Sequence, residues 1–430
     1  MARRFFLSGL LAVAACTQIH PAAAQSTTPP FPRLGGYLIG ASVQSTFGTT
    51  SYQQQVAKLG AAVIGTYPGW SSGGFNMQSA AAAVRAINPN IKLTQYIMTM
   101  SANQSWASQG ASGWGPSWIE YSNANLWLRS TYPSGGIETS GSFNLVNIVD
   151  TGFQQWMATW AAANAMSSNY DGIYIDNVFY QPRSSGDYLK NGTTQTASAE
   201  AQTWRDAYAA FTTKLRAAMP AGSQVWGNTA DWASGSISGY NQMLNGGVIE
   251  SLIGQSYSYE TEGWPQMMNA YKIIMNATTP NGYQIFEQDG TASDYQGMRY
   301  GLTSSLMDNA YYYFNVTGPG GGAIITWFDE FNFNLGPATS AAYSAGTMTP
   351  YQNGVYRRDF ENGIALVNPK GNGTQTVTLE TSYKHLSGTQ APTVNNGQTV
   401  TTVTLNDRDG VILQRLTSQP VPDAPSLSVQ

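Results

Sequence analysis

The chain has 430 residues, which is long enough for one large domain and a smaller one. Only 10% of the residues are charged, the formal net charge is −4, and no basic stripe is present that would predict nucleic-acid binding. The two histidines, His20 and His385, argue against a Ser-His-Asp triad and a His-ligated zinc site. We therefore expect carboxylates to carry any proton transfer, and we expect neither a cofactor nor a metal ion.

The N-terminal segment has the pattern of an export signal. Arg3 and Arg4 precede an apolar run over residues 5–15, and Ala22-Ala23-Ala24 resembles a signal-peptidase site. Residues 1–24 are therefore predicted to be a signal peptide of a secreted or periplasmic bacterial protein. A second interpretation stays open, because Val13-Ala14-Ala15-Cys16 resembles a lipobox and would make Cys16 a lipid anchor. No later apolar run is long enough to form a transmembrane segment.

Strand and helix patterns alternate along residues 33–345. Eight strands are predicted, at residues 36–41, 62–67, 92–98, 172–178, 224–228, 247–252, 284–288 and 323–327. Helical spacing lies between them, at residues 52–59, 77–87, 152–167, 197–219, 236–244, 264–275 and 295–311. The alternation indicates a parallel α/β architecture, and the count of eight favours a (β/α)8 TIM barrel over a doubly wound sheet. No glycine-rich dinucleotide fingerprint follows the first strand.

A long insertion at residues 101–150 separates the third strand from the next helix. It contains six Trp and Tyr residues among Gly, Ser and Asn: Trp106, Trp114, Trp118, Tyr121, Trp127 and Tyr132. Such loops are usually functional or disordered, and the aromatic content argues against disorder. Flat aromatic faces suit sugar rings, although a loop that packs on itself would look the same. Tyr67 and Trp70, in Tyr67-Pro-Gly-Trp70 after the second strand, are further candidates for stacking.

The pattern of the sequence changes near residue 346, from alternating strands and helices to strands alone. Residues 353–369 predict a strand, a tight turn at Glu361-Asn362-Gly363 and a second strand. Alternating strands are also predicted at 374–379, 399–405 and 411–416. We therefore expect a small β-sandwich-like, all-β domain over residues 350–417 that packs against the barrel. A flexible tail is expected at 418–430.

Carboxylates and amides stand at the ends of the predicted barrel strands. In Tyr170-Asp-Gly-Ile-Tyr-Ile-Asp-Asn-Val-Phe179, strand alternation puts Tyr174 and Asp176 on one face. Polar residues also end the later strands: Asn228, Glu250, Glu287 and Asp329. An ionised Asp at the end of a buried strand is costly, and barrel strands open onto the active site at these ends.

Two carboxyl groups flanking one bond are what glycoside cleavage requires. Our candidate catalytic pair is Asp176, as nucleophile or base, and Glu250, as general acid. The apolar neighbours Val248, Ile249 and Leu252 would raise the pKa of Glu250 by desolvation. Glu287 is the rival acid and Asp329 the rival partner. The candidates for holding or stacking on substrate are Tyr67, Trp70, Tyr174 and Asn228. Glu287 and Asp329 are also expected to contact the substrate.

These motifs resemble a known group of bacterial glycoside hydrolases. The Asp-Gly-Ile-Tyr-Ile-Asp-Asn-Val strand, the Gly-Asn of the fifth strand and Gly246-Gly-Val-Ile-Glu250 are similar to the hypothetical glycosyl hydrolase family fifteen. The segment from Tyr356 to Pro369 is similar to a β-domain found after such barrels. The resemblance covers about residues 33–416.

More distantly, the chain is similar to alpha-galactosidase-type barrels and endo-alpha-1,4-polygalactosaminidases. These relatives imply a nucleophilic Asp on the fourth strand, which Asp176 matches, and an acid on a later strand. Glu250 matches the second role by position, with Glu where many relatives have Asp. An α-linked substrate is implied by the resemblance alone.

Three hypotheses about function follow. The first is a secreted hydrolase acting on a polysaccharide or oligosaccharide. The second is a non-catalytic carbohydrate-binding barrel that keeps its aromatic loop for binding. The third is another enzyme class, either a polysaccharide lyase using Tyr and Arg or a metal-assisted hydrolase built on Asp clusters.

Overall fold

The structure is a computed structural model that describes residues 30–40, 46–65, 71–72, 75–109, 126–234, 239–280, 282–344 and 347–416. The predicted signal peptide with Cys16 lies outside the described residues, and so does the tail at 418–430.

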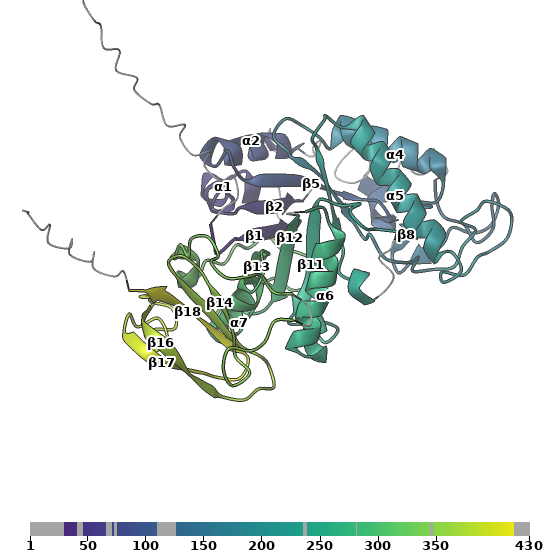
Figure 1. Ribbon diagram of the computed structural model, residues 1–430. Helices are drawn as coiled ribbons and strands as arrows, with labels where there is room; N and C mark the ends of the chain where they lie inside the picture. Colours follow the sequence, from purple (N-terminus) through teal and green to yellow (C-terminus); the bar gives the residue numbers. More distant parts are fainter. Residues whose placement is uncertain are drawn as a thin grey trace, which may run out of the picture.

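Eight parallel strands form the central sheet (Figure 1). In order they are β1 (Gly35–Leu38), β2 (Ala61–Ile64), β5 (Lys92–Met98), β9 (Gly172–Asp176), β10 (Gln224–Asn228), β11 (Gly246–Ile253), β12 (Tyr283–Asp289) and β13 (Tyr311–Asn315). A parallel bridge between Leu34 and Tyr312 joins the first strand to the last. The strands are buried on both faces, as parallel strands covered by helices are. The predicted (β/α)8 barrel is therefore confirmed.

The eighth strand is not where the sequence placed it. Residues 323–327 contain no strand, and β13 is instead Tyr311–Asn315. The expected helix over 295–311 ends earlier, because α7 covers only Tyr295–Leu306. Short apolar runs fit a strand or a buried loop equally well, and Ile325 and Trp327 pack partly buried against the barrel core without pairing.

Six α-helices lie in the described part of the chain: α1 (Thr50–Val56), α2 (Met77–Ile87), α4 (Thr151–Asn164), α5 (Ala201–Ala218), α6 (Trp264–Ala277) and α7 (Tyr295–Leu306). Side-chain caps define where some begin, as Asp150 accepts a hydrogen bond from Phe153 N at 2.8 Å at the start of α4. The helix expected at 236–244 is absent from its described part, since residues 239–244 form turns and an unpaired residue. Four short 3-10 helices complete the set: η2 (Gln104–Gln109), η3 (Trp232–Ser234), η4 (Tyr259–Glu262) and η5 (Asp329–Asn332).

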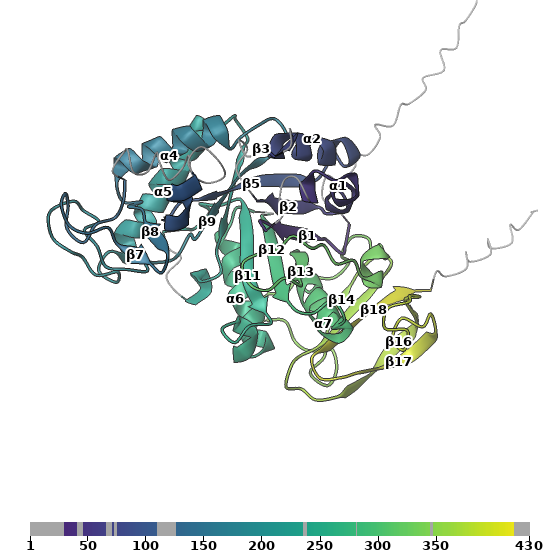
Figure 2. The same ribbon diagram turned by 180° about the vertical axis from the view of Figure 1, so that it is seen from behind.

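The insertion after β5 folds partly into a small antiparallel sheet. Its strands are β6 (Ser101–Asn103), β8 (Phe143–Leu145) and β7 (Thr139–Ser140), and a separate pair, β3 (Ser71–Ser72) and β4 (Phe75–Asn76), precedes α2. Trp127 is 4% exposed and packs in the main core, so its face is closed to a ligand. Trp114, Trp118 and Tyr121 lie outside the described residues. Figures 1 and 2 both show β8 beside α4 and α5, away from the C-terminal sheet.

The C-terminal domain is one five-stranded antiparallel sheet among the described residues, which corrects the β-sandwich-like prediction. Its strands, in spatial order, are β14 (Tyr356–Asp359), β15 (Gly363–Asn368), β18 (Asp409–Arg415), β16 (Gln375–His385) and β17 (Thr399–Leu405). Alternate residues of β15 face different cores. Ile364 and Leu366 join the domain's own core, whereas Ala365 and Val367 join the core of the barrel.

Helix α7 lies between the barrel and this sheet, so Gly297 to Leu306 is buried throughout. The approach is close at Gly410 of β18, where a Cβ atom would lie 2.0 Å from Thr303 Oγ1. Buried ion pairs also cross the interface. Arg299 of α7 contacts Asp409 at 2.9 Å, and Arg408 contacts Glu260 of η4 at 2.5 Å.

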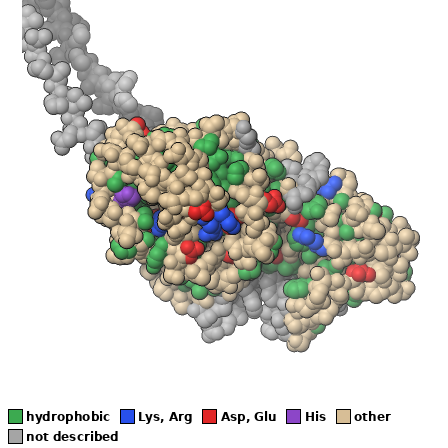
Figure 3. All heavy atoms as spheres, turned by 90° about the horizontal axis from the view of Figure 1, so that it is seen from below, with side chains coloured by type: hydrophobic (Ala, Val, Ile, Leu, Met, Phe, Trp, Pro, Cys, Tyr) green, Lys and Arg blue, Asp and Glu red, His purple; other side chains and the backbone are tan. Residues whose placement is uncertain are grey.

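The surface reflects the low charge content. Seen from below, charged side chains are few and scattered among other groups (Figure 3). None of the helices in the described ranges combines the length and apolar character needed to cross a membrane.

Candidate active site

Asp176 lies at the C-terminal end of β9, the fourth barrel strand, and is 7% exposed. Its carboxylate accepts hydrogen bonds from Tyr96 Oη at 2.7 Å, Asn177 N at 2.8 Å and Asn228 Nδ2 at 3.2 Å. Burial raises the pKa of Asp176 above its ordinary value, and these three donors oppose that rise. The three donors thus offset part of the cost of burying this carboxylate at the mouth of the barrel.

Glu250 reaches the same place from β11, the sixth strand. Alternation puts Glu250 on the face of Val248, which packs inside the barrel. The pairing of β11 with β12 shifts between Ile249 and Ile253, and Ser251 has a φ of 50°. Irregular pairing of this kind is common beside active sites, and Glu250 lines the cavity at this point of β11.

Asn228, at the end of β10, stands between the two acids. Its Nδ2 atom donates to Asp176 Oδ1 at 3.2 Å and to Glu250 Oε2 at 2.7 Å. Because one nitrogen contacts both, these oxygens lie no more than about 6 Å apart. The structure therefore brings together three of the residues predicted from the sequence.

The two acids have different electrostatic surroundings. Burial, followed by the charge of Asp176, raises the pKa of Glu250 to about 7. The hydrogen bond from Asn228 opposes this rise without cancelling it. A carboxyl group with this pKa is still protonated in weakly acidic solution and can donate a proton, whereas Asp176 has three donors that favour its anion.

A cavity of about 460 Å³ opens beside this pair. The residues that line it come from β10 and β11 and from the segments that follow β9, β10 and β11: Asn177, Phe179, Arg183, Asn228, Ala230, Asp231, Glu250, Ser251, Tyr257, Ser258, Tyr259 and Glu262. Asp176 lies behind Asn177 and Asn228, which both contact its carboxylate. The volume is within the usual range for small-molecule sites, about 300–1,000 Å³.

One wall of the cavity carries an ion pair and an aromatic ring. Arg183 contacts Asp231 at 3.2 Å and lies 3.9 Å from the centre of the Phe179 ring. Burial raises the pKa of Asp231 to about 6, although the charge of Arg183 opposes the rise. A planar cation beside a carboxylate and a ring offers donors, acceptors and an apolar face, which are the groups that a sugar needs.

Glu287 is fully buried on β12 and does not line the cavity. Its carboxyl group accepts from Ser251 N at 3.2 Å and from Asn315 Nδ2 at 3.0 Å. Burial, together with the charges of Glu250 and Asp289, raises its pKa well above the ordinary value. Glu287 therefore supports the irregular backbone beside Glu250, and the predicted contact with substrate has no structural support.

The remaining predicted residues lie elsewhere. Tyr174 is fully buried in the barrel, where its ring stacks on Tyr96 at 5.8 Å, so it supports the barrel interior and offers no face to a ligand. Asp329 is in η5, does not line the cavity, and accepts hydrogen bonds through its carboxylate from the backbone N–H groups of Thr389 and Gln390 at 2.7 Å each. Its expected position depended on a strand at 323–327 that does not exist. Tyr67 and Trp70 lie outside the described residues.

Tyr96 and Arg183 were missed from the sequence. Tyr96 lies in the middle of β5, two residues before Met98, which is in register with Asp176. Its reach to Asp176 depends on the register of neighbouring strands, for which one sequence has no signal. Arg183 follows β9 in a loop of polar residues, where a single arginine forms no recognisable sequence motif.

Metal ligation has no visible basis in the described ranges, where no group of three or more His, Cys, Asp or Glu side chains could hold a metal ion.

The chain is similar to solved structures of other proteins. The chain is similar to Amy13B of Eubacterium rectale, with a TM-score of 0.50 and 9% identity, over 90% of this chain and 95% of that one. It is also similar to a maltogenic alpha-amylase of Thermotoga neapolitana, with a TM-score of 0.49 and 7% identity over 89% and 98% of the two chains. A GH27 β-L-arabinopyranosidase of Geobacillus stearothermophilus gives a TM-score of 0.49 and 11% identity over 90% and 96%. At 9% identity the likeness to Amy13B concerns the fold alone.

A search of curated proteins found no match to the sequence. The family comparison is more specific, because the model of hypothetical glycosyl hydrolase family 15 matches residues 85–364. That range contains β5 to β13, and with them Asp176, Asn228 and Glu250. The protein therefore belongs to hypothetical glycosyl hydrolase family 15 and is a glycoside hydrolase.

Proposed function

We propose that this glycoside hydrolase cleaves the glycosidic bonds of a polysaccharide or oligosaccharide with Asp176 as nucleophile and Glu250 as general acid. The observation that carries the proposal is the pair itself. Two carboxyl groups, from the fourth and sixth strands, share one donor, Asn228. Glu250 lines a cavity of about 460 Å³, and Asp176 lies behind Asn228 at its edge.

The reaction would proceed in two steps. Asp176 attacks the anomeric carbon while Glu250 gives its proton to the leaving oxygen, which forms a glycosyl ester on Asp176. Glu250, now ionised, removes a proton from water, and the water releases the sugar from Asp176. This division of roles agrees with a pKa of about 7 for Glu250 and with the three donors on Asp176.

The short distance between the acids supports retention of anomeric configuration. Retaining enzymes hold their carboxyl groups about 5–5.5 Å apart, and inverting ones about 6.5–9.5 Å apart, with room for a water molecule. The shared contact with Asn228 limits the two nearest oxygens to about 6 Å. Retention is therefore part of the proposal.

The proposed setting is outside the cytoplasm. Arg3, Arg4, the apolar run and Ala22-Ala23-Ala24 support export as a secreted or periplasmic enzyme. The lipobox pattern at Cys16 supports the alternative of a lipoprotein, and labelling with a radioactive fatty acid in cells distinguishes the two.

The test uses a panel of p-nitrophenyl glycosides and polysaccharides. With an accepted substrate, proton NMR of the first product reveals its anomeric configuration. We expect Asp176→Asn and Glu250→Gln each to lose at least about 1,000-fold in kcat, as removal of a proton-transfer or nucleophilic group does. Full activity in both variants would contradict the assignment, and an inverted first product would contradict retention.

A further inference from the structure

A second cavity, of about 420 Å³, lies at the opposite end of the barrel. Tyr283 and Tyr311, which line it, are the first residues of β12 and β13, whereas Asp176 and Glu250 lie at or near the C-terminal ends of their strands. The interior of the barrel, including the buried side chains of Val248 and Ile285, separates the two ends. This cavity is therefore distinct from the candidate active site.

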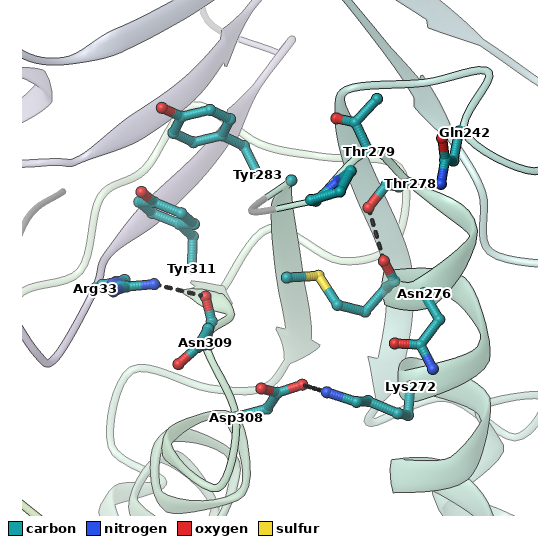
Figure 4. Close-up of a pocket in the computed structure, with 13 residues that line it drawn as sticks. Arg33, Gln242, Lys272, Asn276, Thr278, Thr279, Tyr283, Asp308, Asn309 and Tyr311 are labelled. Atoms are coloured by element: carbon teal, nitrogen blue, oxygen red, sulfur yellow. Dashed lines mark hydrogen bonds and ion pairs between the residues drawn. The ribbon is translucent and has the colours of Figure 1, made fainter. Parts of the chain in front are cut away.

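Its walls combine aromatic rings with polar groups. Figure 4 shows the rings of Tyr283 and Tyr311 on one side and Lys272 and Asn276 of α6 on the other. The two rings lie 5.6 Å apart, and Trp226 stacks behind Tyr283 at 5.4 Å, which fixes that wall. The remaining lining offers amides and hydroxyls, from Gln242, Thr278, Thr279 and Asn309. Ring faces beside many donors and acceptors are typical of sites for sugars.

The charge at this cavity is positive, although the whole chain has a net charge of −4. Among the described lining residues Asp308 is the one acid, and it pairs with Lys272 at 2.6 Å. Arg33 also lines the cavity and donates to the carbonyl of Asn309 at 3.3 Å. Behind Asn309, the guanidinium of Arg358 donates to Asn309 Oδ1 at 3.0 Å. One carboxylate thus faces three cations.

We propose that this cavity binds a saccharide that carries a carboxylate, such as a uronic acid. Arg33 and Lys272 would hold the carboxylate, and the amides and the two tyrosines would contact the ring and its hydroxyls. A cavity of this size is at the lower end of the range for ligand sites and suits one or two sugar rings. The proposal does not depend on the roles of Asp176 and Glu250.

Calorimetric titration with D-glucuronate tests it on the full chain. Asn276 is exposed at the rim, so Asn276→Trp can obstruct the cavity without a cost to the core, and Arg33→Gln removes one cation. We expect each change to weaken binding at least about tenfold, or about 1.4 kcal/mol. Asn164→Trp is the matched control, because Asn164 is an exposed asparagine on α4, and it should bind as the wild type does. Thermal melting monitored by circular dichroism checks that each variant is folded.

Each alternative result has a meaning. Absence of binding in the wild type at tens of millimolar glucuronate would overturn the proposal. Equal affinity for D-glucose would overturn the role of the positive charge, and equal affinity for inorganic phosphate would overturn the role of the sugar ring. Loss of binding in Glu250→Gln would locate glucuronate in the active-site cavity instead. Retained binding in Glu250→Gln, with loss in Asn276→Trp, supports the proposal even if the catalytic assignment fails.

Discussion

Asp176 and Glu250 accept hydrogen bonds from the same atom, the side-chain nitrogen of Asn228. This contact keeps the two acids within about 6 Å of each other, and it opposes the rise that burial causes in both pKa values. Asn228 thus sets both the spacing and the ionisation of the pair. Its position at the end of β10, between β9 and β11 in the sheet, explains how one side chain reaches both.

Asn228→Ala should therefore impair catalysis more than folding. Without the shared donor, the pKa of Asp176 and that of Glu250 both rise, and the acids lose their fixed separation. We expect kcat/KM to fall by about 100-fold, the size of effect seen when a positioned donor is lost. Asn164→Ala, at an exposed site on α4, is the matched control. A fall of less than threefold in Asn228→Ala, at unchanged melting temperature, would contradict the role of Asn228.

Tyr96→Phe should selectively weaken Asp176, the proposed nucleophile. The change removes the hydroxyl that donates to Asp176 Oδ2 at 2.7 Å, and it leaves the ring that stacks on Tyr174. The pKa of Asp176 then rises, so the acidic limb of the pH–rate profile should move to higher pH, with a fall in kcat of about 10-fold to 100-fold. The control is Tyr170→Phe, which also loses a buried hydroxyl contact, to Met77 O at 3.0 Å, away from the pair. A profile of Tyr96→Phe that overlays the wild type would argue against this contact.

The wild-type enzyme should lose activity as the pH rises through about 7. In the proposed mechanism Glu250 acts as an acid only while protonated, and burial and the charge of Asp176 raise its pKa to about 7. At lower pH activity falls again when Asp176 becomes protonated, so kcat/KM should follow a bell-shaped curve. The measurement is kcat/KM against pH for an accepted aryl glycoside. A flat profile between pH 6 and about 9 would exclude Glu250 as the acid.

Glu250 should also make the folded state less stable at alkaline pH. Its pKa is higher in the folded chain than the ordinary 4.5, so its contribution to stability is fully present below about pH 4.5 and is lost as the pH rises through about 7. Glu250→Gln cannot ionise and should melt several degrees above the wild type at pH 8, with little difference at pH 4.5. Glu361→Gln, at an exposed turn of the C-terminal domain, controls for the loss of one carboxylate. Equal melting of Glu250→Gln and wild type at both pH values would disprove this linkage.

The buried pair between Arg299 and Asp409 should matter for stability and not for chemistry. Arg299→Met leaves Asp409 buried without its cation, which should lower the free energy of unfolding by about 3–5 kcal/mol. The double variant Arg299→Met/Asp409→Asn removes the stranded charge and should recover part of the loss. Urea unfolding measures both, and kcat per folded molecule should stay unchanged. An additive double variant would show that the two residues do not interact.

Much of the barrel could be predicted because its strands are short, apolar and separated by helices. Asn228 and Glu250 were found for the same reason, since each is a polar residue at or near the end of an apolar run. The eighth strand was missed because Tyr311-Tyr-Tyr-Phe-Asn315 directly follows helix α7 with only four residues between them, so the helical pattern hid it. Asn315, which contacts Glu287, was lost with it.

The residues that tune the acids were beyond prediction for a different reason. The contact of Tyr96 with Asp176 depends on the register between β5 and β9. The position of Ser251 depends on its φ of 50°, at the point where the pairing of β11 with β12 is irregular. Both properties arise from packing between strands far apart in the sequence. A single chain without aligned relatives contains no local signal for either.

The burial of α7 has a practical consequence for any attempt to shorten or recombine this enzyme. A fragment that ended near residue 345 would leave Arg299 and Glu260 without Asp409 and Arg408, and would expose the side of α7 that β15 and β18 cover. The C-terminal sheet is thus not an interchangeable module of the kind that can be exchanged between enzymes at a linker. Evolutionary or engineered swaps of this sheet would have to carry α7 with it, and α7 is itself a helix of the barrel.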